Sequence, residues 1–137
     1  MKDLSECISF LLSRAAKQAS RVMRGYLAPF GITPTQYAVM RVLFERDGQT
    51  GAGVSTYLQM DSATLTGVID RLNHAGLLER RPDPGDRRVN RLHLSKKGLA
   101  LMPDLDAAVE EANDFLNEMV GNRERALHTG LRRLIDG

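Results

Sequence analysis

The segment from Asp61 to Ser95 constrains the fold most, because its hydrophobic period changes partway along. Up to Gly76 apolar residues recur at helical spacing, whereas Leu77–Arg81 and Asn90–Leu94 read as short strands. Between these two runs stands "PDPGD", whose prolines, glycine and aspartates favour a turn. The segment therefore predicts a helix followed by a β-hairpin.

Two helical patterns precede this segment. Apolar residues at helical spacing predict a long helix over residues 4–27, followed by the stop signals Pro29 and Gly31. The next run starts with Thr33 as N-cap, Pro34 at the first helical position and Gln36 to complete a capping box, and it ends at Gly48. The expected buried stripe of this second helix consists of Tyr37, Met40, Leu43 and Phe44.

A short helix is expected over residues 51–58, although Gly51 and Gly53 each weaken a helix interior by about 1 kcal/mol. Asp61 or Ser62 then caps the helix that ends at Gly76. Its inward-facing residues are Leu65, Val68, Ile69 and Leu72. After the hairpin, the sequence predicts a helix over 96–120 capped by Ser95, with a candidate bend at Pro103, and a last helix capped by Asn122 and ending near Ile135.

This order predicts a mainly α fold: a winged helix-turn-helix with a small β-hairpin wing and dimerisation helices at both ends. A single domain is expected over residues 1–137, because a chain of 137 residues with 42% apolar side chains suits one hydrophobic core. Within it, 32–95 is the expected DNA-binding part, and 1–30 and 96–137 are the expected dimerisation helices.

Cysteine content and the distribution of charge bear on the cellular compartment and on the class of partner. Cys7 is the only cysteine, which excludes an intrachain disulfide, and no apolar run is long enough for a membrane span, so we expect a cytoplasmic protein without membrane contact. Positions 76–98 hold seven Lys and Arg and three acidic residues, whereas 99–121 hold six acidic residues and no basic one. This asymmetry fits a polyanionic partner for the first zone, and it fits two solvated faces equally well.

Double-stranded DNA is the partner that the helix and hairpin suit. A helix entering the major groove needs small, weakly charged residues at its N-terminus, and a hairpin that meets phosphates or a narrow minor groove needs cations. Arg71 is expected to contact phosphate or to pair with Asp70 or a wing aspartate, and Asp86 to brace the turn. The candidate DNA-binding residues are Ser62, Ala63, Thr64, Thr66, Arg71, Arg87 and Arg88.

The stretches "ITPTQYAVMRVL", "LQMDSATLTGVIDRLNHAGLLERR" and "PDPGDRRVNRLHLSKKGLALM" resemble the multiple-antibiotic-resistance regulator (MarR) family of winged-helix transcription factors. The family's wing pattern, Asp-x-Arg followed after five residues by Leu and a hydroxyl residue, falls on Asp86, Arg88, Leu94 and Ser95. The resemblance covers residues 32–102. It implies an obligate homodimer on a pseudo-palindromic operator, most commonly a repressor, with a cleft for a small, often aromatic anionic effector.

An aromatic acid or an acyl thioester is the effector class that we expect. The candidate cleft residues are Tyr26, Tyr37, Met40 and Arg41, with the arginine pairing a carboxylate. Tyr37 and Met40 fit the core equally well. The candidate dimer seam consists of Leu116, Met119, Leu127 and Leu131, for which the intrachain core is the alternative.

Catalysis is not expected, and neither is a metal or cofactor. The histidines 74, 93 and 128 lack the paired spacing of a zinc site, and "GAGVS" lacks the last glycine of a nucleophile elbow. His93 is expected on the outer face of the wing. Two non-enzymatic alternatives are a winged helix that binds only protein, which the arginine-rich wing opposes, and a redox sensor acting through Cys7. In the peroxide-sensing branch the reactive cysteine precedes a phenylalanine, whereas here Ser9 precedes Phe10.

Overall fold

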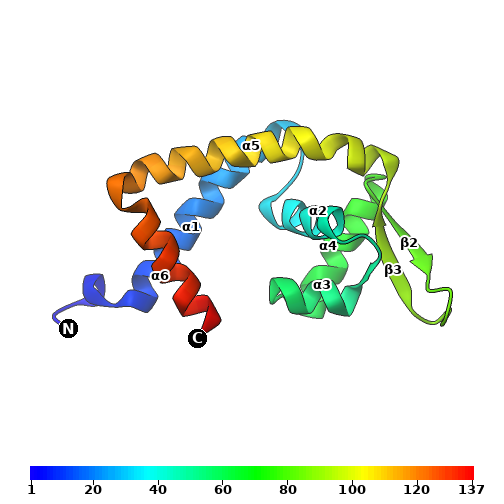
Figure 1. The fold of residues 1–137 in the computed structure, drawn as a ribbon, viewed down its shortest axis with the longest axis horizontal. Helices are drawn as coiled ribbons and strands as arrows, with labels where there is room; N and C mark the ends of the chain where they lie inside the picture. Colours follow the sequence, from blue (N-terminus) through cyan, green and yellow to red (C-terminus); the bar gives the residue numbers. More distant parts are fainter.

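The computed structural model describes all 137 residues as a mainly helical fold with one small sheet, which confirms the predicted fold class (Figure 1). The helices are α1 (Ile8–Leu27), α2 (Pro34–Glu45), α3 (Gly51–Leu58), α4 (Ser62–His74), α5 (Lys96–Val120) and α6 (Glu124–Asp136). The strands are β1 (Gln49–Thr50), β2 (Leu78–Pro82) and β3 (Asn90–Leu94). Single 3-10 turns occupy Leu4–Glu6, Ala28–Phe30 and Gly121–Arg123.

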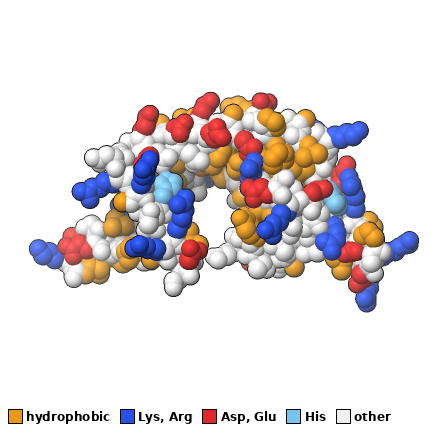
Figure 2. All heavy atoms as spheres, viewed as in Figure 1, with side chains coloured by type: hydrophobic (Ala, Val, Ile, Leu, Met, Phe, Trp, Pro, Cys, Tyr) orange, Lys and Arg blue, Asp and Glu red, His pale blue; other side chains and the backbone are white.

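Helix α5 runs along the molecule and joins two lobes (Figure 1). At one end it packs against α1 and α6, which carry the two chain termini, and at the other it meets α2 and β3. The space-filling view shows that the two lobes are continuous along α5 and separate below it (Figure 2). The packing against α5 therefore sets how the two lobes are placed relative to each other.

Side-chain caps fix where the helices begin. Thr33 Oγ1 accepts a hydrogen bond from the Gln36 N–H at 3.1 Å, and Gln36 Oε1 accepts one from the Thr33 N–H at 2.9 Å, which closes the predicted capping box. Asp61 caps α4, and Ser95 caps α5. These contacts confirm the predicted starts of α2, α4 and α5.

Three boundaries differ from the prediction. Cys7 has an extended backbone, so Leu4–Glu6 forms a separate turn and α1 begins only at Ile8. Helix α2 ends before Gly48, because the chain must turn there to enter β1. Asn122 does not cap α6, since it lies inside a 3-10 turn that runs directly into that helix. Hydrophobic periodicity continues through such turns and cannot reveal them.

The core of the second lobe lies where α2, α4, β3 and α5 meet. All four predicted inward-facing residues of α4 are buried, and so are Met40 and Leu43 of α2. Phe44 is 45% exposed, so the prediction that it is buried is wrong. Its ring instead lies under the Arg41 guanidinium, 5.2 Å from the ring centre, where a cation–π contact replaces core packing.

The sheet is antiparallel with the strand order β1-β3-β2. The predicted alternation of β3 is confirmed: Leu92 and Leu94 are buried, whereas Arg91 and His93 point the other way and are half-buried. His93 is not on an open outer face, because its Nδ1 lies 2.9 Å from Asp47 Oδ2. Strand β1 escaped prediction, since two residues carry no alternation.

The terminal helices expose much apolar surface. Of the candidate seam residues, Met119 is 59% and Leu127 is 42% exposed, while Leu116 and Leu131 are half-buried outside the core cluster. The intrachain-core alternative is therefore wrong for Met119 and Leu127. Further exposed apolar residues on the terminal segments are Leu4, Ile8, Leu11, Phe115, Val120, Leu134 and Ile135.

No helix combines the length and apolar character needed to cross a bilayer.

Ser95 joins α4, the wing and α5 at one buried hydroxyl group. Its Oγ donates a hydrogen bond to the Gly76 carbonyl at 2.6 Å and accepts one from the Gly98 N–H at 3.0 Å. Its own N–H donates to the Leu77 carbonyl at 3.0 Å. Gly98 packs so closely on this joint that an added Cβ would overlap the Leu77 carbonyl oxygen.

Gly98→Ala should therefore destabilise the fold by about 3 kcal/mol, because the backbone at Leu77 cannot move aside without breaking the Ser95 bonds. Urea unfolding at one fixed protein concentration measures the change. Gly25→Ala is the control: Gly25 lies inside α1 with open space around it, so alanine should stabilise by about 0.5–1 kcal/mol. Equal stability of the Gly98→Ala and wild-type proteins would contradict the role of this joint.

Candidate nucleic-acid interface

The N-terminal turns of α4 present a slim, uncharged surface. Ser62, Ala63, Thr64 and Thr66 are all exposed, whereas Leu65 between them is 2% exposed and anchors the helix in the core. The cap at Asp61 and the apolar residues at helical spacing produce this arrangement. A surface of small side chains allows the backbone of α4 to approach a groove closely.

Both threonine hydroxyl groups on this surface already donate within the helix. Thr64 Oγ1 donates to Asp61 Oδ2 at 2.8 Å, and Thr66 Oγ1 donates to the Ser62 carbonyl at 2.8 Å. The Thr64 N–H and hydroxyl group hold the pKa of Asp61 below its usual value. Each threonine therefore offers a hydroxyl acceptor and a methyl group to a ligand, which suits a base amino group or a thymine methyl.

Arg71 lies further along α4, exposed and without an ion pair. Asp70, one of the partners expected for it, is instead paired with Arg80 of β2. The wing aspartates are also taken, Asp83 by Arg91 and Asp86 by Arg88. The internal ion pair expected as one option for Arg71 is therefore not formed, and its charge is free for an external anion.

The wing turn places Arg87 and Arg88 at the far end of the hairpin. The carboxylate of Asp86 accepts from the Arg88 N–H at 3.1 Å, from Nε at 3.1 Å and from Nη2 at 3.2 Å. These bonds hold the pKa of Asp86 below its usual value, while the Arg88 side chain stays 90% exposed. Arg87 is exposed and has no carboxylate partner. The tip of the wing is the basic projection at the lower right of Figure 2.

The four candidate cleft residues do not line one cavity. Met40 is completely buried, so it belongs to the core. The Tyr37 hydroxyl donates to Asp106 Oδ1 at 2.7 Å, and Arg41 Nη1 donates to Asp106 Oδ2 at 2.8 Å. Burial and the Asp106 carboxylate raise the pKa of Tyr37. Arg41 also pairs with Glu45, so its charge is already compensated within the chain.

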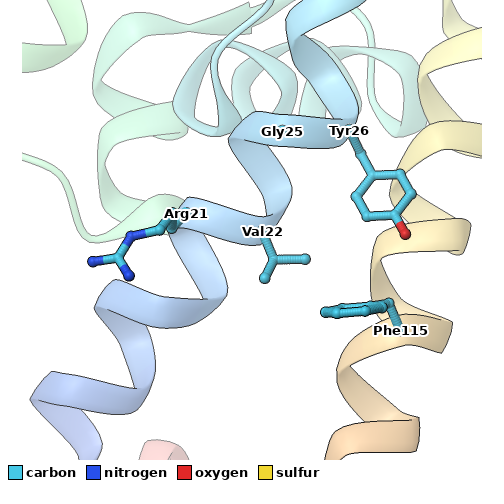
Figure 3. Close-up of a pocket in the computed structure, with 5 residues that line it drawn as sticks. All are labelled: Arg21, Val22, Gly25, Tyr26 and Phe115. Carbon is cyan, nitrogen blue, oxygen red and sulfur yellow. The ribbon is translucent and has the colours of Figure 1, made fainter.

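Tyr26 does line a cavity, on α1 beside α5 (Figure 3). This cavity has a volume of about 340 Å³, and its other lining residues are Arg21, Val22, Gly25 and Phe115. In Figure 3, Val22 and Tyr26 extend from α1 toward Phe115, whereas Arg21 extends to the other side. The Tyr26 and Phe115 rings lie 6.5 Å apart between centres. Phe115 escaped prediction, because only the packing of α1 on α5 brings it near Tyr26.

The remaining reactive side chains are dispersed. His74 is exposed on α4, and His128 bonds Asn117 between α6 and α5. Cys7 is half-buried at the start of α1. No group of three or more His, Cys, Asp and Glu side chains is arranged to hold a metal ion.

Residues 32–89 match the family described as the MarR family. Over 122 residues the chain is 30% identical to the HTH-type transcriptional regulator MhqR of Bacillus subtilis, and the match covers 86% of this chain and 84% of that protein. The structure is also similar to that of Bordetella bronchiseptica BpsR, whose DNA binding is regulated by 6-hydroxynicotinic acid. The TM-score is 0.91 at 27% identity, with 100% of this chain and 99% of that chain covered.

A third relative is the transcriptional repressor CouR. Its structure bound to a 23-mer DNA duplex matches with a TM-score of 0.89 at 28% identity, covering 100% of this chain and 97% of that chain. CouR from Rhodococcus jostii RHA1 bound to p-coumaroyl-CoA matches with a TM-score of 0.85 at 28% identity, covering 98% and 93% of the two chains.

Proposed function

This chain belongs to the MarR family of winged helix-turn-helix transcription regulators, and on that premise we propose how it reads DNA and how it is controlled. It is a DNA-binding transcription regulator and not an enzyme. We propose that it acts as a repressor, binding a pseudo-palindromic operator as a homodimer and leaving it when a small effector binds.

One observation carries the proposal. The exposed, small-residue face of α4 stands beside an arginine-rich wing, on a fold that matches DNA-bound CouR with a TM-score of 0.89. A partner protein would favour apolar residues on the wing, whereas Arg87 and Arg88 suit phosphates or a narrow minor groove.

The proposed contacts divide between base reading and backbone positioning. Ser62, Ala63, Thr64 and Thr66 would lie at base edges in the major groove. Arg71, Arg87 and Arg88 would meet phosphates or the minor groove, because flat and permanently charged guanidinium groups suit both. Asp86 would orient Arg88 through the forked pair at the tip of the wing.

Replacing Thr64 and Arg71 tests this division. Thr64→Ala should change the preference among duplexes selected from a random library by the wild-type protein, by about 1–3 kcal/mol at one base pair. Arg71→Ala should weaken all duplexes alike and lower the salt slope of binding by about one unit. Binding titrations over a salt series measure both effects.

Lys17→Ala is the matched control for Arg71→Ala, because Lys17 is an exposed cation of α1, far along the chain from α4 and the wing. It should leave affinity and salt slope near the wild-type values. Equal effects of the Thr64 and Arg71 variants on every duplex would refute the division of roles. Binding that is absent even at low salt would refute the proposed function itself.

The exposed apolar surface of the terminal helices supports the homodimer. Residues 1–30 and 96–137 would form the seam, and 32–95 would form the DNA-binding part. A monomer that left Met119, Leu127 and Ile135 open to water would expose an apolar patch of the kind that marks interfaces. With two-fold symmetry, two α4 helices would meet successive major grooves about 10 base pairs apart.

Leu127→Glu should weaken dimerisation about tenfold or more, because a buried carboxylate without a partner is costly at an interface. Sedimentation at micromolar concentration should show a dimer for the wild-type protein and dissociation for the variant. Phe44→Glu is the control, since Phe44 is comparably exposed but lies on α2, outside both seam segments. A folded wild-type monomer at that concentration would exclude the dimer.

An aromatic acid or its coenzyme A thioester is the proposed effector class. BpsR and CouR, which respond to or bind molecules of these kinds, support it. In this chain we propose the cavity between α1 and α5 as the site, where Tyr26 and Phe115 offer two rings and Val22 an apolar wall. Arg21 also lines this cavity, and its guanidinium, which donates to Gln18 Oε1 at 3.0 Å, would have to rotate to pair with an effector carboxylate.

Phe115→Ala should reduce the potency of such an effector in releasing DNA about tenfold, because one of the two rings is lost. Arg41→Ala is the control for ligand contact: it should leave the affinity of the DNA-free protein for the effector unchanged, since Arg41 is engaged by Asp106 and Glu45 and does not line this cavity. Competition titrations with aromatic acids and their thioesters measure the release, and direct titrations without DNA measure the affinity. Effector affinity lost in the Arg41 variant and kept in the Phe115 variant would move the site back to α2.

A further inference from the structure

An arginine on the central strand joins the turn of the wing to the segment that follows α2. Arg91 lies in β3 and is half-buried, and its guanidinium bridges two separate segments. Nε and Nη2 lie 2.9 Å and 2.8 Å from Asp83 Oδ2, and Nη1 donates to the Gly48 carbonyl at 2.9 Å. Arg91 thus joins the turn of the wing to the turn that follows α2.

The Gly48 end of this bridge leads directly into α3. Gly48 has a positive φ of 76°, and its N–H donates to the Leu92 carbonyl at 3.0 Å. Two residues later Thr50 pairs with Arg91 in the sheet, and its side chain caps α3 by accepting from the Gly53 N–H at 3.1 Å. One short segment therefore ends in the wing sheet and begins the first helix of the helix-turn-helix.

The Asp83 end controls the tip of the wing. Asp83 is 19% exposed at its side chain; its Oδ1 accepts from the Gly85 N–H at 2.7 Å, and its N–H donates to the Val89 carbonyl at 2.8 Å. The Gly85 N–H first, and then Arg91, hold the pKa of Asp83 below its usual value. Asp83 closes the turn that carries Arg87 and Arg88, so whatever fixes Asp83 fixes the direction of the tip.

One other arginine of the wing also reaches the helix-turn-helix: Arg80 of β2 pairs with Asp70 of α4, from the middle of that strand and not from the wing turn. The remaining two pairs are local. Arg81, which faces Arg91 across the strands, pairs with Glu79 of its own strand at 2.7 Å. Arg88 pairs with Asp86 two residues away. Neither pair connects the wing to the helix-turn-helix, whereas the Arg91 bridge reaches Gly48, 43 residues back along the chain.

We propose that Arg91 is a positioning residue for DNA binding. It does not touch the duplex; by holding Asp83 and Gly48 together it sets the distance between the wing tip and the helix-turn-helix, so that both can meet one duplex. The inference rests on the proposed role of the wing in binding DNA. A wing held in place beforehand loses less conformational freedom on binding.

Five variants test the proposal with duplexes that the wild-type protein selects from a random library. Arg91→Ala should lower affinity about tenfold and lose hydroxyl-radical protection of the backbone at the flanks, while guanine N7 atoms in the central major groove of each half-site stay protected from dimethyl sulfate. Its salt slope should stay at the wild-type value, whereas Arg88→Ala should lower the slope by about one unit. Arg91→Lys should behave like Arg91→Ala, because a single ammonium cannot bridge both partners.

The matched control is Arg81→Ala, which removes the same charge from the neighbouring strand without breaking the bridge. Its affinity should stay within about twofold of wild type. Thermal unfolding of every variant accompanies the titrations, so that a general loss of folding is recognised.

Asp83→Asn separates the bridge from a simple charge effect, because the two predict opposite changes in affinity for DNA. It removes a negative charge close to the duplex, so long-range electrostatics alone would tighten binding. The bridge predicts the opposite: the amide keeps one acceptor for Gly85 but offers Arg91 no carboxylate, and flank protection should be lost with about tenfold weaker binding.

Three results would overturn the proposal. A salt slope lowered by about one unit in Arg91→Ala would make Arg91 a direct phosphate contact. Tighter binding by Asp83→Asn would show that Asp83 affects DNA binding only through its negative charge and not through the bridge. Wild-type affinity with intact flank protection in Arg91→Ala would make the bridge irrelevant. Failure of the wild-type protein to select any duplex would instead refute the proposed function.

Discussion

The Ser95 hydroxyl group is the contact on which the arrangement of the second lobe depends. It follows the last strand of the wing and links Gly76, just after α4, to Gly98 in the first turn of α5. Ser95 is the one polar residue among the buried ones. Because this hydroxyl group both donates and accepts a hydrogen bond, its hydrogen-bonding capacity is satisfied inside an apolar core. The two bonds fix the direction in which α5 leaves the wing. Because α5 leaves from this point, its direction also places the first lobe.

Charge is organised around this joint in two different ways. On the wing, Arg80, Arg88 and Arg91 each have a carboxylate partner, which orients the strands and the turn. Arg71 and Arg87 have none, and such unpaired cations gain most from a phosphate. From Leu99 to Gly121 every charged residue is acidic, and Figure 2 shows acidic side chains along the outer face of α5. This face would repel the proposed DNA partner and favour its approach from the wing side.

Helix α5 also connects the proposed effector cavity to the DNA-binding lobe. Phe115 lines the cavity, and two and a half turns earlier Asp106 binds Tyr37 and Arg41 of α2. A ligand that separates α1 from α5 acts on the helix that holds α2 in place. In the proposed dimer, control would need no contact between effector and DNA, because a small shift of a rigid helix would change the spacing of the two α4 helices.

The sequence by itself determined the helices, their caps and the wing, because these depend on neighbouring residues: Thr33, Asp61 and Ser95 cap helices within three positions, and apolar periodicity marks the faces. It also marked the exposed threonines of α4 and the arginines of the wing. Only the tertiary structure decided which partners those charges have and which apolar residues meet. Arg41 pairs with Asp106, and Met40 is buried in the core. Phe115 lies beside Tyr26, and Gly48 lies beside Arg91, although the two members of each pair are far apart in the chain. Such contacts depend on how α5 and the sheet pack, and no local pattern encodes a distance between segments that are dozens of residues apart.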